Sequence, residues 1–502
     1  MAQGGPLLSA RLPDPGTARA RLLAAVAGML GAAGMAPLHQ ALVAMFGISA
    51  VLWLILREGG PRQAFITAWW AGAGHFILWF NWIVSPFFVD PWVYGWMAPF
   101  ALGRMSGGMA LVWAAAAALS WRFARRRLAF LALLALGEMG RGYLFTGFPW
   151  ALIGHQWIGS AVEHYAALIG QYGLTLMTLV LAALPVVAGR RGAAVMALCV
   201  AGLSIGGATL GARPVPGEPR AVSLRLVQPN AEQDLKWDPA VARDLFRRHL
   251  DMTRQGAPAD LTIWPETAIP YLFEFETEVP GIIAKASGGK PVALGIQRVE
   301  GERGWNSLRI VEGQGEVTQT YDKYHLVPFG EYMPFGDALH DLFGLSAFAA
   351  QVGNGYSAGT APQVLDLGPD LGRVLPLICY EAVFPQGIRA APSRADWMLQ
   401  ITNDAWFGTL SGPFQHFDLA RLRSIEFGLP LVRVANTGVT AVIDARGHVV
   451  ARLPFGVTDK LDVAAIPPAL PPTPYAKWGD WPAFVLIMLL LAGAAMRRRR
   501  FA

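Results

Sequence analysis

The chain contains only two cysteines, Cys199 and Cys379, in 502 residues. They lie in very different surroundings, one in an apolar run and one in a more polar region, so we expect no disulfide between them. Cysteine and histidine at zinc-type spacing are also absent. Lysine is missing before Lys236, and charged residues make up only 15% of the chain, against about 25% in typical soluble domains. These shortages exclude a disulfide scaffold and argue against an entirely soluble protein.

Apolar and aromatic residues, in contrast, make up 54% of the sequence, which excludes a disordered chain. The net charge of +6 is unevenly distributed, because residues 218–470 hold 29 acidic and 22 basic residues while the rest holds 6 and 19. The basic excess therefore belongs to the apolar part, where arginines flank hydrophobic runs. This pattern indicates membrane topology, and no nucleic-acid-binding motif accompanies it.

Eight apolar stretches have about 17 residues or more, the length needed to cross a hydrocarbon core about 30 Å thick. They lie at residues 22–38, 40–56, 64–84, 92–119, 128–148, 162–188, 192–210 and 481–496. No convincing cleavage site follows the first stretch, so we expect it to be retained. The predicted organisation is a membrane bundle of about seven spans at 1–213, a soluble domain at 214–470, and a tether, final span and arginine-rich tail at 471–502.

Arginines occur in alternate loops between these stretches. They cluster at residues 57–62, 122–127 and 190–191 and in the tail at 497–500, whereas the short loop at 85–91 has no Lys or Arg. By the positive-inside rule, the arginine-bearing loops face the cytoplasm. Both termini are then cytoplasmic, and the soluble domain lies on the other side of the membrane.

Arg104, Glu138 and Arg141 are ionisable residues that fall inside predicted apolar stretches. Glu138 and Arg141 have helical i,i+3 spacing and could form a buried pair that fixes packing. Alternatively, charges at membrane depth could line a cavity for a lipid headgroup or peptide. The sequence leaves both interpretations open. The following Thr-Gly-Phe-Pro-Trp at residues 146–150 is expected to end a helix near the membrane interface.

The hydrophobic period changes after a Pro/Gly-rich linker at residues 214–219. Alternating or short apolar runs predict strands, and amphipathic stretches at 239–255 and 413–427 predict helices. Strands alternating with helices predict a layered α/β domain. The predicted strands are 221–228, 261–264, 291–297, 305–311, 316–321, 373–379, 397–402, 430–435 and 439–444.

Three of these strands end at ionisable residues, where α/β domains commonly build their sites. They lead to Glu266, to Lys323 and to Cys379. Separately, each has an ordinary structural explanation, since a lone cysteine is usually a core residue and a glutamate after proline usually a cap. Together they supply a thiol nucleophile, a carboxylate base and an ammonium that stabilises developing negative charge, which are the groups that covalent acyl transfer requires. The backbone N–H of Tyr380 could add an oxyanion donor.

These segments resemble the Glu–Lys–Cys triad of the carbon–nitrogen hydrolase, or nitrilase, superfamily. The whole layout resembles the bacterial inner-membrane apolipoprotein N-acyltransferases, on the apolar bundle, residues 146–150, 264–267 (Trp-Pro-Glu-Thr), 323–331 (Lys-Tyr-His-Leu-Val-Pro-Phe-Gly-Glu) and 379–381 (Cys-Tyr-Glu). The resemblance implies an extracytoplasmic αββα sandwich with Glu266 as base, Lys323 as oxyanion stabiliser and Cys379 as nucleophile. It also implies supporting or substrate-binding roles for Glu331, Tyr380, Glu381 and Trp237.

The resemblance further implies transfer of a fatty acyl chain from a membrane phospholipid, through a thioester on Cys379, to the N-terminal amine of a diacylglyceryl-cysteine lipoprotein. It implies a multi-pass protein of the inner membrane with its catalytic domain in the periplasm, and no metal or organic cofactor. Two alternatives are a membrane-tethered amidase that uses water as acceptor and a receptor or transporter that performs no chemistry. A bundle of eight spans has no purpose in a hydrolase of soluble amides, and a receptor has no need of Cys379.

Several further features have weaker signals. The apolar, glycine-punctuated stretch at 336–353 is expected to be a lid that dips into lipid, or else a helix that covers the sheet. His325 and His416 are expected to have structural roles rather than to transfer protons. Residues 403–408 follow a predicted strand and are expected to shape an acyl pocket.

Overall fold

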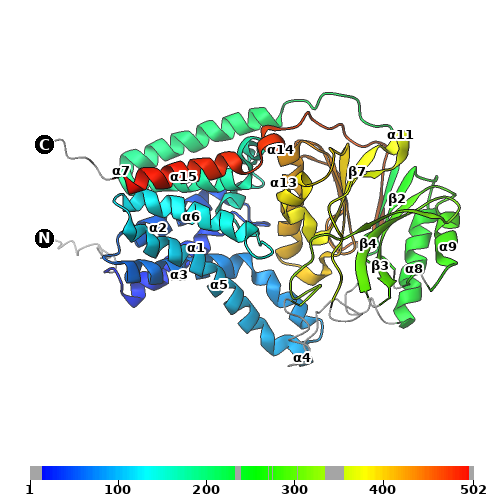
Figure 1. Ribbon diagram of the computed structural model, residues 1–502, viewed down its shortest axis with the longest axis horizontal. Coiled ribbons are helices and arrows are strands. Elements are labelled where there is room, and N and C mark those ends of the chain that lie inside the picture. Colours follow the sequence, from blue (N-terminus) through cyan, green and yellow to red (C-terminus); the bar gives the residue numbers. More distant parts are fainter. Residues whose placement is uncertain are drawn as a thin grey trace, which may run out of the picture.

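The computed structural model describes residues 14–496 apart from 232–238, 270, 274, 302 and 334–354. A helical bundle and a sheet-rich domain lie side by side, and the final helix returns from the domain to the bundle (Figure 1). Of the predicted features, Trp237, the whole stretch 336–353 and the arginine tail lie outside the described residues.

Long apolar helices form the bundle, and many glycine and alanine residues allow them to approach closely. At Gly74, for example, an added Cβ would lie 2.1 Å from the carbonyl oxygen of Ala25 on the neighbouring helix. The main helices are α1 (Ala18–Gly31), α2 (Ala41–Leu56), α3 (Pro61–Trp79), α5 (Ala98–Leu119), α6 (Arg126–Tyr143), α7 (Ala166–Gly211) and α15 (Trp481–Ala495). Between α3 and α5 the chain forms η1 (Asn81–Phe88), α4 (Pro91–Tyr94) and η2 (Gly95–Met97).

The helix α7 is interrupted at Gly170 and Gly189, which have positive φ angles of 64° and 56°. Glycine adopts such angles without steric cost, so a helix can change direction there. The break at Gly189 lies between the sixth and seventh predicted spans. In the described residues, two helical stretches, Pro91–Arg122 and Ala161–Gly211, are long and apolar enough to cross a membrane, and Ala41–Leu56 and Trp481–Ala495 are shorter apolar helices.

The ion pair of Glu138 and Arg141 is buried inside the bundle, with 0% and 8% of each residue exposed. Two guanidinium nitrogens of Arg141 donate to Glu138 at 3.0 and 3.2 Å, and the group also donates to the carbonyls of Phe148, Trp150 and Ala151. These contacts favour the packing interpretation, because the pair ties α6 to the segment that follows it. Arg104, by comparison, is exposed on α5.

The domain contains two six-stranded sheets. The first has the order β12-β1-β2-β3-β4-β5, with β12 (Asp459–Val463), β1 (Leu224–Gln228), β2 (Leu261–Ile263), β3 (Val292–Glu300), β4 (Arg303–Val311) and β5 (Val317–Asp322). The second has the order β11-β10-β9-β8-β7-β6, with β11 (Val449–Arg452), β10 (Ala441–Ile443), β9 (Leu431–Ala435), β8 (Trp397–Thr402), β7 (Arg373–Ile378) and β6 (Leu365–Asp366). Central strands β1, β2 and β3 pair in parallel, as do β7, β8 and β9.

Apolar side chains from both sheets meet in one core, to which Leu226, Ile263, Val374 and Ile401 belong. A second core joins the first sheet to its covering helix α9 (Val279–Ala286), beside α8 (Pro239–Arg254). A third joins the second sheet to α13 (Gly412–Phe427), which lies between that sheet and the bundle (Figure 1). The layers are therefore helix, sheet, sheet and helix, and this confirms the predicted two-sheet nitrilase-like domain.

The predicted strands all occur, with ends shifted by a few residues. Three further strands, β6, β11 and β12, were not predicted, because they are short or half exposed and lack a clear alternation. The C-terminal tether also contains a short helix, α14 (Pro474–Trp478), capped by the hydroxyl of Thr473. As predicted, α6 ends before residues 146–150.

Candidate active site

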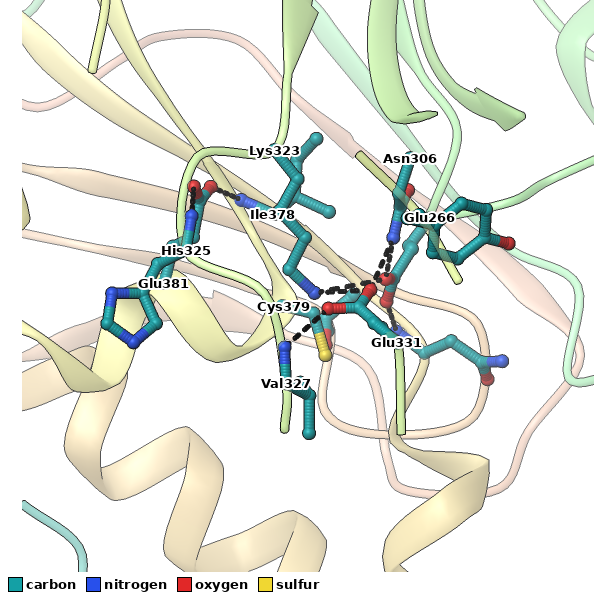
Figure 2. A network of polar contacts seen from close by, with 12 residues as sticks. Glu266, Asn306, Lys323, His325, Val327, Glu331, Ile378, Cys379 and Glu381 are labelled. Carbon is teal, nitrogen blue, oxygen red and sulfur yellow. Dashed lines mark hydrogen bonds and ion pairs between the residues drawn. The ribbon is translucent and has the colours of Figure 1, made fainter. Parts of the chain in front are cut away.

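The three predicted catalytic residues converge from the two sheets. Glu266 follows β2 and Lys323 follows β5 in the first sheet, whereas Cys379 follows β7 in the second. All three are buried, with 6%, 1% and 7% of each residue exposed. Figure 2 shows the ammonium of Lys323 beside the carboxylates, with the sulfur of Cys379 next to them. Residues far apart in sequence therefore share one enclosed polar site.

The ammonium of Lys323 lies between two carboxylates. Its Nζ donates to Oε1 of Glu331 at 2.8 Å and lies 3.8 Å from Oε1 of Glu266. Burial alone would lower the pKa of Lys323, but the two carboxylates outweigh it and raise the pKa above its ordinary value. Lys323 is therefore fully charged at neutral pH and can stabilise negative charge that develops on a reacting group.

Hydrogen bonds fix both carboxylate oxygens of Glu266. Oε1 accepts from the side-chain amide of Asn306 at 2.7 Å, and Oε2 accepts from the backbone N–H of Asn403 at 2.8 Å. These donors hold the carboxylate at one position beside the thiol (Figure 2). A carboxylate so placed can act as a general base without reorganising.

The nucleophile candidate, Cys379, has an unusual backbone conformation with a φ of 53°. A non-glycine residue in this left-handed region is strained, and such strain is often found at functional sites. Burial and the Glu266 carboxylate raise the pKa of the Cys379 thiol, and the nearby Lys323 ammonium opposes them. The resting thiol is therefore protonated, and its reaction requires a base to remove the proton.

Glu381 links the segment that carries the lysine to the segment that carries the thiol. Its carboxylate is buried and accepts four hydrogen bonds of 2.7 to 3.1 Å, all but one of them from backbone N–H groups. The donors are the hydroxyl of Tyr321 and the backbone of Tyr324, His325 and Ile378. Glu381 thus fixes the relative position of Lys323 and Cys379.

The other supporting residues have equally local contacts. Glu331 accepts from the backbone N–H of Val327 at 2.8 Å as well as from Lys323. These two contacts hold the segment from Lys323 to Glu331 around the ammonium. The ring of Tyr380 packs edge-on against Phe384, with centroids 4.8 Å apart. His325 stacks on Phe384 with ring centroids 3.8 Å apart.

Two contributors to the site were missed by the sequence analysis. Asn306 is a buried polar residue within β4, and Asn403 belongs to a segment to which only a pocket role was given. Asn306 places an amide inside an apolar strand, and burying an amide costs free energy unless it forms hydrogen bonds. This feature of the sequence could have identified Asn306. In the described residues, no group of three or more His, Cys, Asp or Glu is arranged to hold a metal ion.

Comparisons with known proteins cover both parts of the chain. Residues 223–470 match the carbon–nitrogen hydrolase family, and residues 27–184 match the apolipoprotein N-acyltransferase N-terminal domain. The apolipoprotein N-acyltransferase of Bradyrhizobium diazoefficiens is 37% identical over 95% of each chain. That of Caulobacter vibrioides is 38% identical and covers 95% of this chain and 94% of its own. Among solved structures, a Nesterenkonia amidase of the nitrilase superfamily is 20% identical, with a TM-score of 0.38, over 53% of this chain and 96% of its own.

Proposed function

Because the chain belongs to the apolipoprotein N-acyltransferase family, we propose that it N-acylates lipoproteins through a thioester on Cys379. The observation that carries this proposal is the convergence of Glu266 and Lys323 on Cys379 inside a buried site. The acyl donor is a membrane phospholipid, and the acceptor is the N-terminal amine of a diacylglyceryl-cysteine lipoprotein. We assign Cys379 as nucleophile, Glu266 as general base and Lys323 as oxyanion stabiliser.

In the first half-reaction, Glu266 takes the proton of the Cys379 thiol as the sulfur attacks the ester carbonyl of the phospholipid. A carbon–sulfur bond forms, and negative charge develops on the carbonyl oxygen, where the Lys323 ammonium stabilises it. The carbon–oxygen bond of the ester then breaks, and Glu266 returns the proton to the leaving alkoxide. A lysophospholipid departs, and the acyl chain remains on Cys379 as a thioester.

In the second half-reaction, the neutral amine of the lipoprotein attacks the thioester. Glu266 accepts a proton from the nitrogen, and the carbon–sulfur bond breaks as the amide forms. The proton then passes from Glu266 to the departing thiolate, which restores the starting state. The same carboxylate therefore acts as base and as acid in each half-reaction.

The remaining predicted residues complete the proposal. Glu331 holds the ammonium of Lys323 in place, and Glu381 holds the two catalytic segments together. Tyr380 supplies a backbone N–H to the oxyanion. Trp237 lies outside the described residues and is assigned to substrate binding on the family resemblance alone.

We further propose that eight spans anchor the enzyme in the inner membrane, namely α1, α2, α3, α5, α6, the parts of α7 before and after Gly189, and α15. The bundle is assigned to residues 1–213, the periplasmic catalytic domain to 214–470, and the final span with its cytoplasmic tail to 471–502. Both substrates are lipids that leave a bilayer only at a cost of about 0.8 kcal/mol per buried methylene. A catalytic domain that is anchored at both ends can reach them without extracting them.

The test is mass spectrometry of the full-length protein in detergent after incubation with a palmitoyl phospholipid. We expect one palmitoyl group on the peptide that contains Cys379, which hydroxylamine removes. Cys379→Ser should abolish the adduct, whereas Cys199→Ser, which changes the exposed cysteine of α7, should retain it. An adduct of unchanged yield in Cys379→Ser would refute the assignment of the nucleophile.

The fate of the thioester separates acyl transfer from hydrolysis. In an acyltransferase the adduct should persist in water and disappear when a diacylglyceryl-cysteine peptide is added, with equal formation of the N-acylated peptide. Rapid loss of the adduct in buffer alone would instead favour the amidase alternative. Glu266→Gln should slow formation of the adduct by about 10²- to 10⁴-fold, the range expected for general acid–base catalysis.

A further inference from the structure

The backbone carbonyl of Cys379 accepts a hydrogen bond from a neighbouring side chain, and this contact gives that side chain a role in the site. The left-handed φ of 53° is unfavourable for a residue with a side chain, so neighbouring groups must hold it. The direction of the thiol depends on this conformation, because the Cα–Cβ bond turns with the backbone. A group that fixes the Cys379 carbonyl therefore constrains the backbone from which the thiol projects.

Gln400 supplies such a group. It lies in β8, which pairs in parallel with β7, the strand that leads to Cys379. The side-chain Nε2 of Gln400 donates to the carbonyl oxygen of Cys379 at 3.0 Å, and the residue is fully buried. This contact links the nucleophile directly to the centre of the second sheet.

Two neighbours determine which way the Gln400 amide faces. The guanidinium of Arg433 donates to Oε1 of Gln400, so that atom must be the carbonyl oxygen and the other end must carry the hydrogens. Nε2 of Gln400 also lies 3.3 Å from Nε2 of His416. Nδ1 of His416 lies 2.8 Å from the carboxylate of Asp404, which accepts its proton.

The resulting set of contacts uses every hydrogen-bonding atom of the amide. Burial lowers the pKa of His416. Its Nε2 lies 3.1 Å from the Cys379 carbonyl oxygen as well as beside the Gln400 amide, so this carbonyl is contacted by both Gln400 and His416. Arg433 pairs with Asp404 at 2.5 Å, which neutralises its charge inside the core.

We propose that Gln400 is a positioning residue that holds the Cys379 carbonyl and thereby helps to aim the thiol at the substrate, with Arg433 fixing its amide and His416 contacting the same carbonyl. This inference rests on the function proposed above and adds a residue to it. The surroundings are continuous with the membrane bundle, because the His416 ring stacks on Trp150 with centroids 5.8 Å apart. Trp150 also donates to Gln415 on the same helix at 2.7 Å.

The decisive variant is Gln400→Glu, which keeps the shape of the side chain and its pairing with Arg433 but removes both donors. We expect the rate of thioester formation on Cys379 to fall about ten- to a hundredfold, because even a small misplacement of a reacting group slows its reaction. The KM for the phospholipid should stay within about twofold, because Gln400 does not contact the substrate. Alkylation of Cys379 by iodoacetamide, followed over a range of pH, should slow in parallel.

Gln228→Glu is the matched control. Gln228 is also a fully buried strand residue whose amide donates to backbone carbonyls, those of Pro454 and Val457 in place of that of Cys379. It should alter the melting temperature of the protein without lowering the rate of thioester formation. An equal loss of rate in both variants would show a merely structural effect and overturn the proposal.

Gln400→Met provides a second route, since it keeps the length of the side chain and has no donor. Either Gln400 variant acylating at the wild-type rate, in protein that melts normally, would overturn the inference. Failure of both variants to fold would also overturn it, by showing that Gln400 acts in stability. Cys379→Ser separates the two proposals. If Cys379→Ser retains activity, the assignment of Cys379 as nucleophile is refuted. If Cys379→Ser abolishes thioester formation while the Gln400 variants form it at the wild-type rate, only the proposal for Gln400 is wrong.

Discussion

The side-chain amide of Asn306 donates to both Glu266, at 2.7 Å, and Glu331, at 3.0 Å. One residue of β4 therefore spaces the proposed base from the carboxylate that holds Lys323. Without it, the two buried carboxylates would lose their common donor and be held by the ammonium that they share and by a backbone N–H each. The arrangement gives each carboxylate its own place, so that Glu266 remains directed at the thiol.

Replacing Asn306 tests this spacing. Asn306→Leu removes the shared donor from two buried carboxylates, and the loss of a hydrogen bond to a charged group costs about 1.5–3 kcal/mol. We expect thioester formation to slow by about ten- to a hundredfold in protein that still folds. The measurement is the rate of acyl adduct formation with a palmitoyl phospholipid. A wild-type rate would show that Asn306 is not needed to position Glu266.

Lys323 should affect both stability and chemistry, and a double variant separates the two. Lys323→Met leaves Glu266 and Glu331 without their counter-charge in a buried site, so we expect a loss of about 3–5 kcal/mol in the free energy of unfolding. Adding Glu331→Gln should restore much of that stability but none of the activity. Thermal unfolding and adduct formation are measured on the same samples. Activity recovered together with stability would contradict the oxyanion role.

His325 should make the stability of the protein dependent on pH. Burial and the nearby Lys323 ammonium lower the pKa of His325 to about 4, below its unfolded value of about 6.5. Between these two values the unfolded chain binds the extra proton, so stability falls as the pH falls, by about 1.4 kcal/mol per pH unit. Above the unfolded pKa the effect is absent.

The comparison with His325→Phe isolates this contribution. Phenylalanine preserves a ring that stacks on Phe384 and cannot titrate. The difference in unfolding free energy between the variant and the wild type should therefore change steadily between pH 6.5 and pH 4, and stay constant above. A difference that is independent of pH would mean that His325 titrates normally in the folded protein.

Replacing Arg141 should destabilise the protein more than replacing Glu138, its partner in the buried ion pair of the bundle. Arg141→Met leaves the Glu138 carboxylate uncompensated and also removes the donors to Phe148, Trp150 and Ala151, so we expect a loss of about 3–5 kcal/mol. Glu138→Gln removes one charge but keeps a hydrogen-bonding side chain and should be milder. Melting temperatures in detergent provide the comparison. Equal losses would show that the ion pair, and not the carbonyl contacts, holds the segment at residues 146–150.

The candidate catalytic residues could be predicted from short segments of the sequence, but the contacts that position them could not. Glu266, Lys323 and Cys379 each follow a predicted strand, and together their residue types supply the groups that covalent acyl transfer requires. The partners that fix them come from elsewhere, since Asn306 lies in mid-strand and Gln400 in a strand with no catalytic motif. No local pattern distinguishes such a buried amide from an ordinary polar residue.

The pair of Glu138 and Arg141 shows the same limit in the bundle. Their spacing predicted a contact, but it could not decide between a packing role and the lining of a cavity. The structure favours packing because Arg141 also donates to three carbonyls beyond the end of α6.

Composition and periodicity by themselves determined the broad architecture, because long apolar runs and alternating strands reflect the solvent that each side chain meets. They also supplied a thiol, an ammonium and a carboxyl group at the ends of strands. Only the tertiary structure decided which of these groups meet, since strands from two sheets had to pack face to face before Glu266 could approach Cys379. The tertiary structure also decided the left-handed conformation of Cys379 and the positions of the amides around it. Both depend on contacts between segments far apart in the chain.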